Sequence, residues 1–237
     1  MMENCYDYLK ENYAAAAEKI SNAAKLSGRD AKDITLISVT KTVPQEIIAQ
    51  AIQLGAYDIG ENKVQEMLSK EEYLSQYPHR THIIGHLQTN KVKYLPGKVN
   101  MIQSVDSEKL ADEIEKVFGA ANMCCDVLAE VNIGAEESKS GVSPQNLERL
   151  CIYLEEKPHI RLKGLMCIPP ICENDLVRNY FAEMYKLFVD IRDKKLDNKD
   201  INILSMGMSA DFEAAIAEGA NMVRIGTSLF GKRNYNI

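Results

Sequence analysis

The chain has 237 residues, with 34 Asp plus Glu, 28 Lys plus Arg and a formal net charge of −6. Hydrophobic residues make up 46% and charged residues 26%, an ordinary globular composition that excludes an intrinsically disordered chain. No apolar run approaches the ~18 residues of a membrane span, and the first residues, MMENCYDYLKENY, do not form a secretory signal. The acidic balance argues against a protein that coats nucleic acid, because phosphate neutralisation needs a basic surface.

The six cysteines do not form a disulfide framework. None of them forms a C-x-x-C pair and two are adjacent, whereas disulfide scaffolds are short, secreted and dense in cysteine. We therefore expect a cytoplasmic protein in which the thiols serve as small hydrophobic side chains.

Helical and β-rich segments alternate along the chain. Residues 3–26 are rich in Ala, Glu, Lys and Leu, which predicts one helix ending at Ser27-Gly28. The strands predicted after it are 34–40, 56–60, 81–84, 99–104, 125–132, 162–167, 201–205 and 222–225. The helical segments predicted between them are 46–54, 64–74, 90–94, 107–118, 144–156, 175–194 and 211–218.

Strands that alternate with helices imply parallel pairing, because a parallel return requires a crossover. The pattern predicts an α/β fold, a (β/α)8 barrel of the TIM type with an extra amino-terminal helix, as a single domain over residues 1–237. An open doubly wound sheet is the alternative, but it usually carries a glycine-rich turn after its first strand, and Lys41-Thr42-Val43-Pro44 has no glycine. Few residues follow the last predicted strand, so we expect the amino-terminal helix to cover the place of an eighth outer helix.

Lys41 is the sharpest candidate for chemistry. Active sites of such barrels lie at the carboxyl ends of the strands, and Lys41 ends the first strand. It shares a strand face with Ile37 and Val39, so its amine is expected in the partly closed mouth of the barrel. Desolvation there favours the free amine, which forms a Schiff base with a carbonyl compound. A solvated lysine at a strand end is the alternative.

The loops after the seventh and eighth strands are candidates for holding a phosphate group, as these loops frequently do in barrels. Segments 205–209 and 226–228 combine glycine with hydroxyl side chains, which suits an anion if Asp211 and Glu213 point away. Alternatively, the glycines serve only turns, and Ser209 or Asp211 only caps the next helix.

Arg224 alternates with outward-facing Val223 and Ile225, which predicts that its guanidinium enters the mouth between Lys41 and the phosphate loop. A guanidinium does not give up its proton at working pH. If Arg224 donates to the nitrogen of a pyridine ring, that nitrogen stays unprotonated and the ring becomes a poor electron sink. A surface arginine paired with a carboxylate is the alternative.

The histidines do not predict a metal site. His82 and His86 are four residues apart, which on a strand separates them by ~13 Å at ~3.3 Å per residue. No Ser-His-Asp or Cys-His arrangement follows from the spacing either.

Six ordered segments together resemble the pyridoxal phosphate homeostasis protein family, from about residue 30 to residue 231. That family resembles the barrel domain of alanine racemase but lacks the second, β-rich domain of the racemase. The segments are VTKT at 39–42, IGEN at 59–62, GHLQTNK at 85–91, KSG at 139–141, LSMGMSAD at 204–211 and VRIGT at 223–227.

The resemblance implies a role for each matching residue. Lys41 matches the lysine that holds pyridoxal 5′-phosphate (PLP) as an internal aldimine, and Lys139 matches a loop lysine of the family. The other implied cofactor-binding residues are Asn62 beside the ring, Ser205 and Met206 lining the site, Arg224 facing the pyridine nitrogen, and Ser209, Gly226 and Thr227 on the phosphate.

The resemblance also implies a function in supplying or buffering PLP within the cell, without established catalysis. A racemase needs an acid or base on each face of its substrate, and in the racemase relatives a tyrosine of the partner's second domain serves the face opposite the lysine. This chain ends at Ile237 without such a domain, so we expect a monomeric PLP carrier. The expected partners are PLP itself and PLP-dependent apo-enzymes, with no metal, nucleic acid or membrane.

Three other functions stay open. A weak PLP-dependent amino-acid racemase would exchange the α-hydrogen of alanine, and a lysine-dependent aldolase would trap pyruvate or glyceraldehyde phosphate without a cofactor. An interaction module that has lost its ligand would have an empty and inert barrel mouth.

Overall fold

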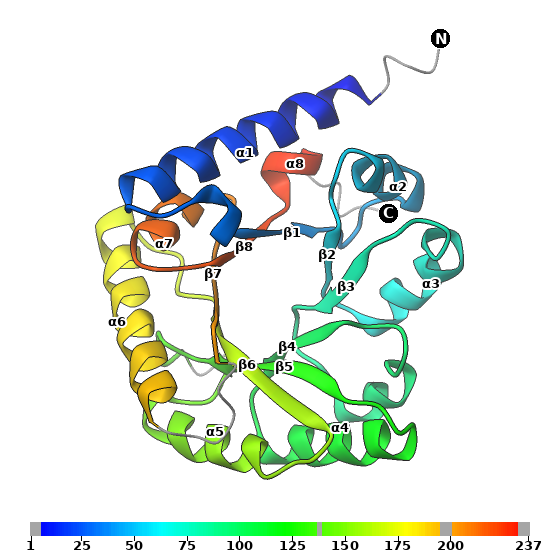
Figure 1. The fold of residues 1–237 in the computed structure, drawn as a ribbon, viewed down its shortest axis with the longest axis vertical. Coiled ribbons are helices and arrows are strands. Elements are labelled where there is room, and N and C mark those ends of the chain that lie inside the picture. The colour runs from blue at the N-terminus through cyan, green and yellow to red at the C-terminus, as the bar shows by residue number, and fades with distance from the viewer. Residues whose placement is uncertain (1–5, 137–138, 195–200, 232–237) are drawn as a thin grey trace.

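The β-rich runs of the sequence form a closed barrel of eight parallel strands, in which each strand pairs with the next and β8 pairs with β1 (Figure 1). The predicted (β/α)8 barrel is therefore confirmed. This computed structural model describes residues 6–136, 139–194 and 201–231. The strands are β1 (Thr35–Val39), β2 (Asp58–Glu61), β3 (Arg80–Ile83), β4 (Met101–Val105), β5 (Cys125–Val131), β6 (Ile160–Cys167), β7 (Ile203–Met208) and β8 (Met222–Ile225).

Helices surround the barrel and cover its outer face (Figure 1). The α-helices are α1 (Asp7–Leu26), α2 (Gln45–Gln53), α3 (Val64–Leu74), α4 (Glu108–Ala120), α5 (Leu147–Glu155), α6 (Asn174–Asp193), α7 (Phe212–Ala217) and α8 (Thr227–Phe230). Short 3₁₀ segments are η2 (Ala31–Asp33), η3 (Thr89–Tyr94) and η4 (Pro144–Asn146). Within the described part of the chain, no helix has the length and apolarity needed to cross a membrane.

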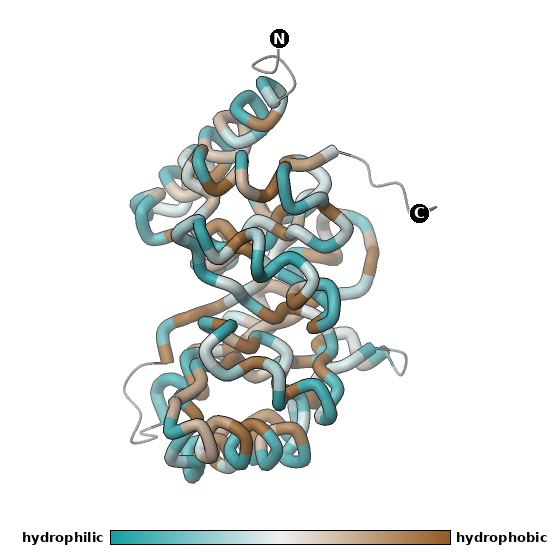
Figure 2. The backbone as a smooth tube through the Cα atoms, turned by 90° about the vertical axis from the view of Figure 1, so that its right-hand side faces the viewer, coloured by the Kyte–Doolittle hydropathy of each residue, from teal (hydrophilic) through white to brown (hydrophobic). Residues whose placement is uncertain are grey.

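The main hydrophobic core lies between the strands and this outer layer of helices. Figure 2 shows hydrophobic and hydrophilic residues alternating along the helices. On α4 the side chains of Leu110, Ile114 and Phe118 recur at helical spacing and are buried, so this helix turns one apolar stripe toward the strands. Val223 and Ile225 of β8 belong to the same buried cluster, which confirms that they face outward, toward the helices.

The amino-terminal helix covers the barrel next to the last strands, as expected. α1 packs against α7 and α8 (Figure 1). Tyr13 Oη donates a 2.8 Å hydrogen bond to Ser38 Oγ of β1, and the Tyr13 ring meets the Phe230 ring edge to face at 6.3 Å. The sequence predicts no outer helix after β8, but one turn of four residues, α8, follows it and packs against α1.

Strand β7 is longer than its sequence predicts. The prediction ends the strand at Ser205, whereas β7 continues to Met208. Gly207 has a φ of +91°, and the register between β7 and β8 shifts between Ser205 and Met208. A bulge at a glycine with positive φ lets the strand bend and continue, which a sequence pattern of alternating side chains does not reveal.

The contact between Tyr13 and Ser38 predicts a pH-dependent attachment of α1. Burial raises the pKa of Tyr13 to about 12, although the hydrogen bond with Ser38 acts in the opposite direction. The folded protein then keeps the phenol protonated while the unfolded chain ionises above about pH 10, so this stabilisation is present below pH 10 and is lost as the pH rises toward 12.

We expect Tyr13→Phe to lower the free energy of unfolding by ~1 kcal/mol at about pH 8 through loss of the hydrogen bond. The difference between wild type and variant should shrink by ~1 kcal/mol at about pH 11, because a tenfold change in protonation is worth ~1.4 kcal/mol. Urea unfolding at both pH values measures this. A difference that stays constant with pH would contradict the raised pKa of Tyr13.

Candidate functional site

A cavity of about 300 Å³ opens at the carboxyl ends of the barrel strands. Its walls come from the segments after β1, β2, β3 and β6 and from the ends of β7 and β8. Six residues singled out from the sequence line this one cavity: Lys41, Asn62, Ser209, Arg224, Gly226 and Thr227.

Closure of the barrel brings the first and last strands together at this cavity. In the β1–β8 register, Ile37 lies opposite Arg224 and Ser38 lies opposite Ile225. Lys41 therefore leaves β1 beside the place where Gly226 leaves β8. Lys41 is half-buried and lines the cavity, which confirms the predicted placement of its side chain in the barrel mouth.

The Arg224 guanidinium is buried inside the barrel, with 3% of the residue exposed. Nη1 donates to Ser205 Oγ at 2.7 Å, and Nη2 donates to the Cys167 carbonyl oxygen at 2.8 Å. Burial lowers the pKa of Arg224, and Cys167, Glu130 and Asp211 nearby act in the opposite direction. The alternative of a surface arginine paired with a carboxylate is wrong, because Arg224 is buried and its direct hydrogen bonds in the described chain go to neutral oxygens.

Ser205 holds Arg224 instead of lining the cavity. Its hydroxyl accepts from Arg224 and donates to Gln103 Oε1 at 2.7 Å. Gln103 Nε2 in turn donates to His82 Nδ1 at 3.2 Å, and His82 Nε2 lies 2.9 Å from Asp58 Oδ1. A chain of buried polar contacts thus continues from Arg224 into the barrel interior and fixes the guanidinium from behind.

Met206 lies outside the cavity as well. The sequence prediction ends the strand at Ser205 and places Met206 just after it, lining the site, but β7 continues through Met206, whose side chain belongs to the hydrophobic cluster that contains Phe212. Met208, which follows the glycine bulge, lines the cavity in its place. The extension of β7 is the physical reason for this correction.

The loops after β7 and β8 form one set of hydroxyl and N–H groups at the cavity wall. Ser209 Oγ accepts from Gly226 N at 3.1 Å and from Ser228 N at 3.5 Å, so the two loops are joined through this hydroxyl. Ser209 makes these contacts instead of capping α7. The combination of small residues and hydroxyl groups suits an anion such as phosphate.

The two nearby carboxylates, Asp211 and Glu213, do not line the cavity, which fits the predicted anion site. Asp211 Oδ1 accepts from Met208 N at 2.5 Å and so folds back on its own loop, where burial raises the pKa of Asp211. Glu213 is exposed and lies 3.6 Å from Lys19 Nζ of α1.

Lys139 does not reach this cavity. Its Nζ donates to the Pro169 carbonyl oxygen at 3.1 Å and pairs with Glu136. It lines a neighbouring cavity of about 620 Å³ together with His86, and Ile168 borders both cavities. The Lys139 amine is thus held on the other side of the barrel mouth from Lys41.

The histidines remain apart. His82 is buried within β3 and bonded to Asp58, whereas His86 lies on the loop after β3 with Nδ1 3.5 Å from Asp106 Oδ2. Among residues 6–136, 139–194 and 201–231, no group of three or more His, Cys, Asp or Glu side chains is arranged to hold a metal ion.

The side chains around the cavity fit a phosphorylated carbonyl compound with a hydrogen-bond acceptor in its ring. Lys41 supplies an amine for the carbonyl group, and the Ser209–Gly226–Thr227 wall supplies donors for the phosphate. Arg224 supplies a buried guanidinium without a direct carboxylate partner among the described residues, and such a buried donor favours an acceptor in the cavity.

The chain is similar to known proteins over nearly its whole length. The family model described as "Alanine racemase, N-terminal domain" matches residues 9–234. A protein of Aquifex aeolicus named pyridoxal phosphate homeostasis protein is 47% identical over 226 residues, which cover 95% of this chain and 98% of the relative.

Two solved structures share the fold. The structure of PipY from Synechococcus elongatus with PLP bound has a TM-score of 0.78 at 29% identity, covering 90% of this chain and 100% of PipY. An alanine racemase of Clostridium difficile has a TM-score of 0.70 at 18% identity, covering 97% of this chain and 57% of the racemase. The second likeness shows that the fold is that of the racemase amino-terminal domain.

The bulge at Gly207 predicts a specific sensitivity to substitution. A Cβ at Gly207 would lie 2.5 Å from Ala215 Cβ and 2.9 Å from Phe212 Cα, in addition to requiring a positive φ. We expect Gly207→Ala to lower the free energy of unfolding by roughly 1–3 kcal/mol through overpacking against α7. Gly55→Ala is the matched control, because Gly55 also has a positive φ but no neighbour within 4 Å. Equal losses of stability in the two variants would contradict the packing argument.

Proposed function

Since this chain belongs to the pyridoxal phosphate homeostasis protein family, we propose that it binds PLP in the mouth of its barrel and serves in intracellular vitamin B6 homeostasis. One observation carries the proposal. Lys41, Arg224 and the Ser209–Gly226–Thr227 wall, which are far apart in the sequence, line a single cavity. PipY, of the same fold, has been solved with PLP bound, which supports the choice of ligand.

Lys41 is the proposed covalent site. Lys41 Nζ condenses with the aldehyde carbon of PLP, forming a C=N bond as one water is released. The bond is reversible, so one amine can both capture and release a reactive aldehyde. When bound, PLP supplies an electrophilic carbon and an aromatic ring that can accept electrons.

The other residues are proposed to hold the cofactor without reacting with it. Ser209, Gly226 and Thr227 bind the phosphate, and Asn62 lies beside the ring. Arg224 donates to the ring nitrogen, with Ser205 and the Cys167 carbonyl fixing its orientation. Because a guanidinium keeps its proton, this contact leaves the ring nitrogen unprotonated and the cofactor weakly activated.

We propose that the protein is a PLP carrier without turnover. Lys41 is the one acid–base group among the described residues lining the cavity apart from the always charged Arg224, since the wall carries no His, Asp, Glu, Tyr or Cys. A racemase needs a second such group on the opposite face of its substrate, and positioned acid–base groups contribute roughly 10²–10⁴-fold each.

Several further properties stay predictions from the sequence. They are a single domain over residues 1–237, a cytoplasmic location, a monomeric state, and PLP-dependent apo-enzymes as recipients of the cofactor. The absence of metal, nucleic acid and membrane partners is likewise a prediction from the sequence.

We expect the purified protein, after incubation with PLP, to show a visible absorbance band that hydroxylamine removes. Lys41→Ala should lose the band, because no other amine lines the cavity among the described residues. Lys63→Ala is the control, since Lys63 is exposed next to Asn62 and does not line the cavity. A full band in Lys41→Ala would contradict the assignment of the covalent site.

The absence of turnover has its own test. In D2O, the PLP-loaded protein should exchange the α-hydrogen of alanine no faster than free PLP does at the same concentration. Proton NMR follows the loss of the α-proton signal. Exchange that is faster than with free PLP, and that disappears in Lys41→Ala, would favour a racemase.

A further inference from the structure

The turn that carries Lys41 has a strained backbone. Val43 N donates to the Thr40 carbonyl oxygen at 3.0 Å, which closes a turn with Lys41 and Thr42 at its centre. Thr42 has a φ of +59°, and this left-handed conformation is rare for a β-branched residue. Strained residues of this kind keep their conformation only where the surroundings impose it, and they gather at functional sites.

Two side chains of α3 hold this turn, one on each side of Lys41. Lys70 Nζ donates to the Thr40 carbonyl oxygen at 2.9 Å, and Thr42 N donates to Glu66 Oε1. Glu66 and Lys70 are four residues apart on one helix face and pair with each other at 2.7 Å. The backbone atoms before and after Lys41 are therefore tied to the same helix.

The Lys70–Glu61 side of this cluster is buried, whereas the hydrogen bond between Thr42 N and Glu66 is exposed to solvent. Lys70 Nζ also lies 2.8 Å from Glu61 Oε1, the same oxygen to which Thr40 Oγ1 donates at 2.7 Å. Glu61 is 1% exposed and Lys70 is 8% exposed. Buried ion pairs contribute little net stability but fix geometry, and loss of one partner leaves an unpaired buried charge. The cluster is thus suited to setting the position of the turn.

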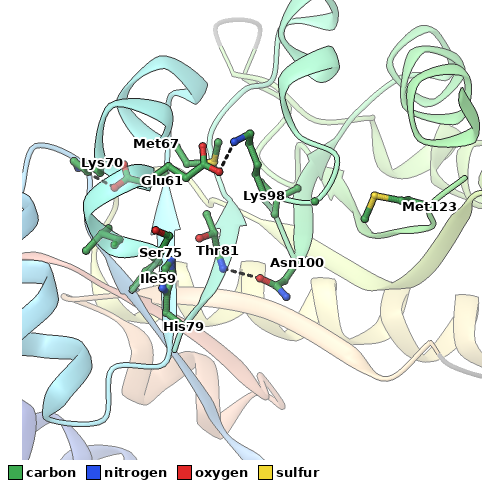
Figure 3. Close-up of a pocket in the computed structure, with 14 residues that line it drawn as sticks. Ile59, Glu61, Met67, Lys70, Ser75, His79, Thr81, Lys98, Asn100 and Met123 are labelled. Carbon is green, nitrogen blue, oxygen red and sulfur yellow. Dashed lines mark hydrogen bonds and ion pairs between the residues drawn. The ribbon is translucent and has the colours of Figure 1, made fainter. Parts of the chain in front are cut away.

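A third cavity, of about 400 Å³, borders the cluster from outside the barrel (Figure 3). Glu61 and Lys70 lie on one side of it and Lys98 on another (Figure 3). Lys98 forms an ion pair with Glu71 of α3, which also lines the cavity. Both pairs anchor α3, but the described contacts of Glu71 and Lys98 do not include the Lys41 turn. This difference supplies a matched control within one helix.

We infer that Lys70 and Glu66 are positioning residues that fix the turn around Lys41 and so aim its amine into the cavity between Arg224 and the phosphate wall. The inference rests on the proposed function for the identity of the ligand. We call Glu66, Lys70 and their contacts with the turn the clamp. It consists of contacts within this chain alone and can be tested without PLP.

The test uses the full chain and three variants: Glu66→Ala, Lys70→Met and, as the control, Lys98→Met. Hydrogen exchange of the cofactor-free protein, followed by mass spectrometry, reports on the amides of Thr42 and Val43. We expect exchange in segment 40–43 to rise at least about tenfold in Glu66→Ala and Lys70→Met, because hydrogen bonds to charged groups are worth more than a tenfold change in an opening equilibrium. It should stay unchanged in Lys98→Met.

A titration with PLP then follows the visible band. Retention of PLP should weaken about tenfold in both clamp variants, equivalent to ~1.4 kcal/mol, and should be unchanged in Lys98→Met. Lys70→Met leaves Glu61 with an unpaired buried charge; if it does not fold, Glu66→Ala decides, since it keeps the Lys70–Glu61 pair.

The remaining outcomes separate the clamp from the function. Unchanged exchange at 40–43 in Glu66→Ala, or exchange that rises equally throughout the barrel, would overturn the clamp. Faster exchange at 40–43 with undiminished PLP retention would overturn its positioning role. Faster local exchange in a protein whose wild type binds no PLP would leave the clamp standing and contradict the proposed function alone.

Discussion

Pairing between β1 and β8 is the constraint on which the site depends. These strands lie at opposite ends of the chain, yet their register places Ser38 opposite Ile225. The segments that leave them, with Lys41 on one side and Gly226 and Thr227 on the other, must then emerge side by side. An amine and an anion-binding wall meet because the sheet is closed, whereas the first and last strands of an open doubly wound sheet are not neighbours.

Closure of the barrel also buries polar side chains, whose hydrogen-bonding partners must then be other buried groups. Arg224 occupies the barrel interior and donates to Ser205 and to the Cys167 carbonyl oxygen. Both acceptors are neutral, and no carboxylate among the described residues bonds to the guanidinium directly. The line of contacts through Gln103 and His82 gives the guanidinium one orientation. A rigid donor at the cavity wall is a pre-organised contact for a ligand, because its ordering is completed when the barrel folds.

Some of this arrangement follows from sequence pattern and some does not. Alternation of β-rich and helical segments predicts the barrel, and alternation along one strand predicts that Arg224 faces inward while Val223 and Ile225 face the helices. The extension of β7 could not be predicted in this way, because Gly207 permits a bulge without requiring one. Met208 therefore lines the cavity in place of Met206.

The clamp around Lys41 could not be predicted from the sequence either. The spacing of Glu66 and Lys70 on a predicted helix indicates that they can pair. This spacing is the one feature of the sequence that points to the clamp. Their contacts with Thr40 and Thr42 depend on how α3 packs against β2 and on the positive φ of Thr42, neither of which a hydrophobic pattern specifies.

The position of the covalent adduct tests the central claim most directly. Freshly purified protein is supplied with PLP, reduced with borohydride, digested and mapped by peptide mass spectrometry. The closed barrel predicts that the adduct lies on Lys41, the lysine that shares a cavity with Arg224 and the phosphate wall. An adduct confined to another lysine, such as Lys139 or Lys63, would contradict the account.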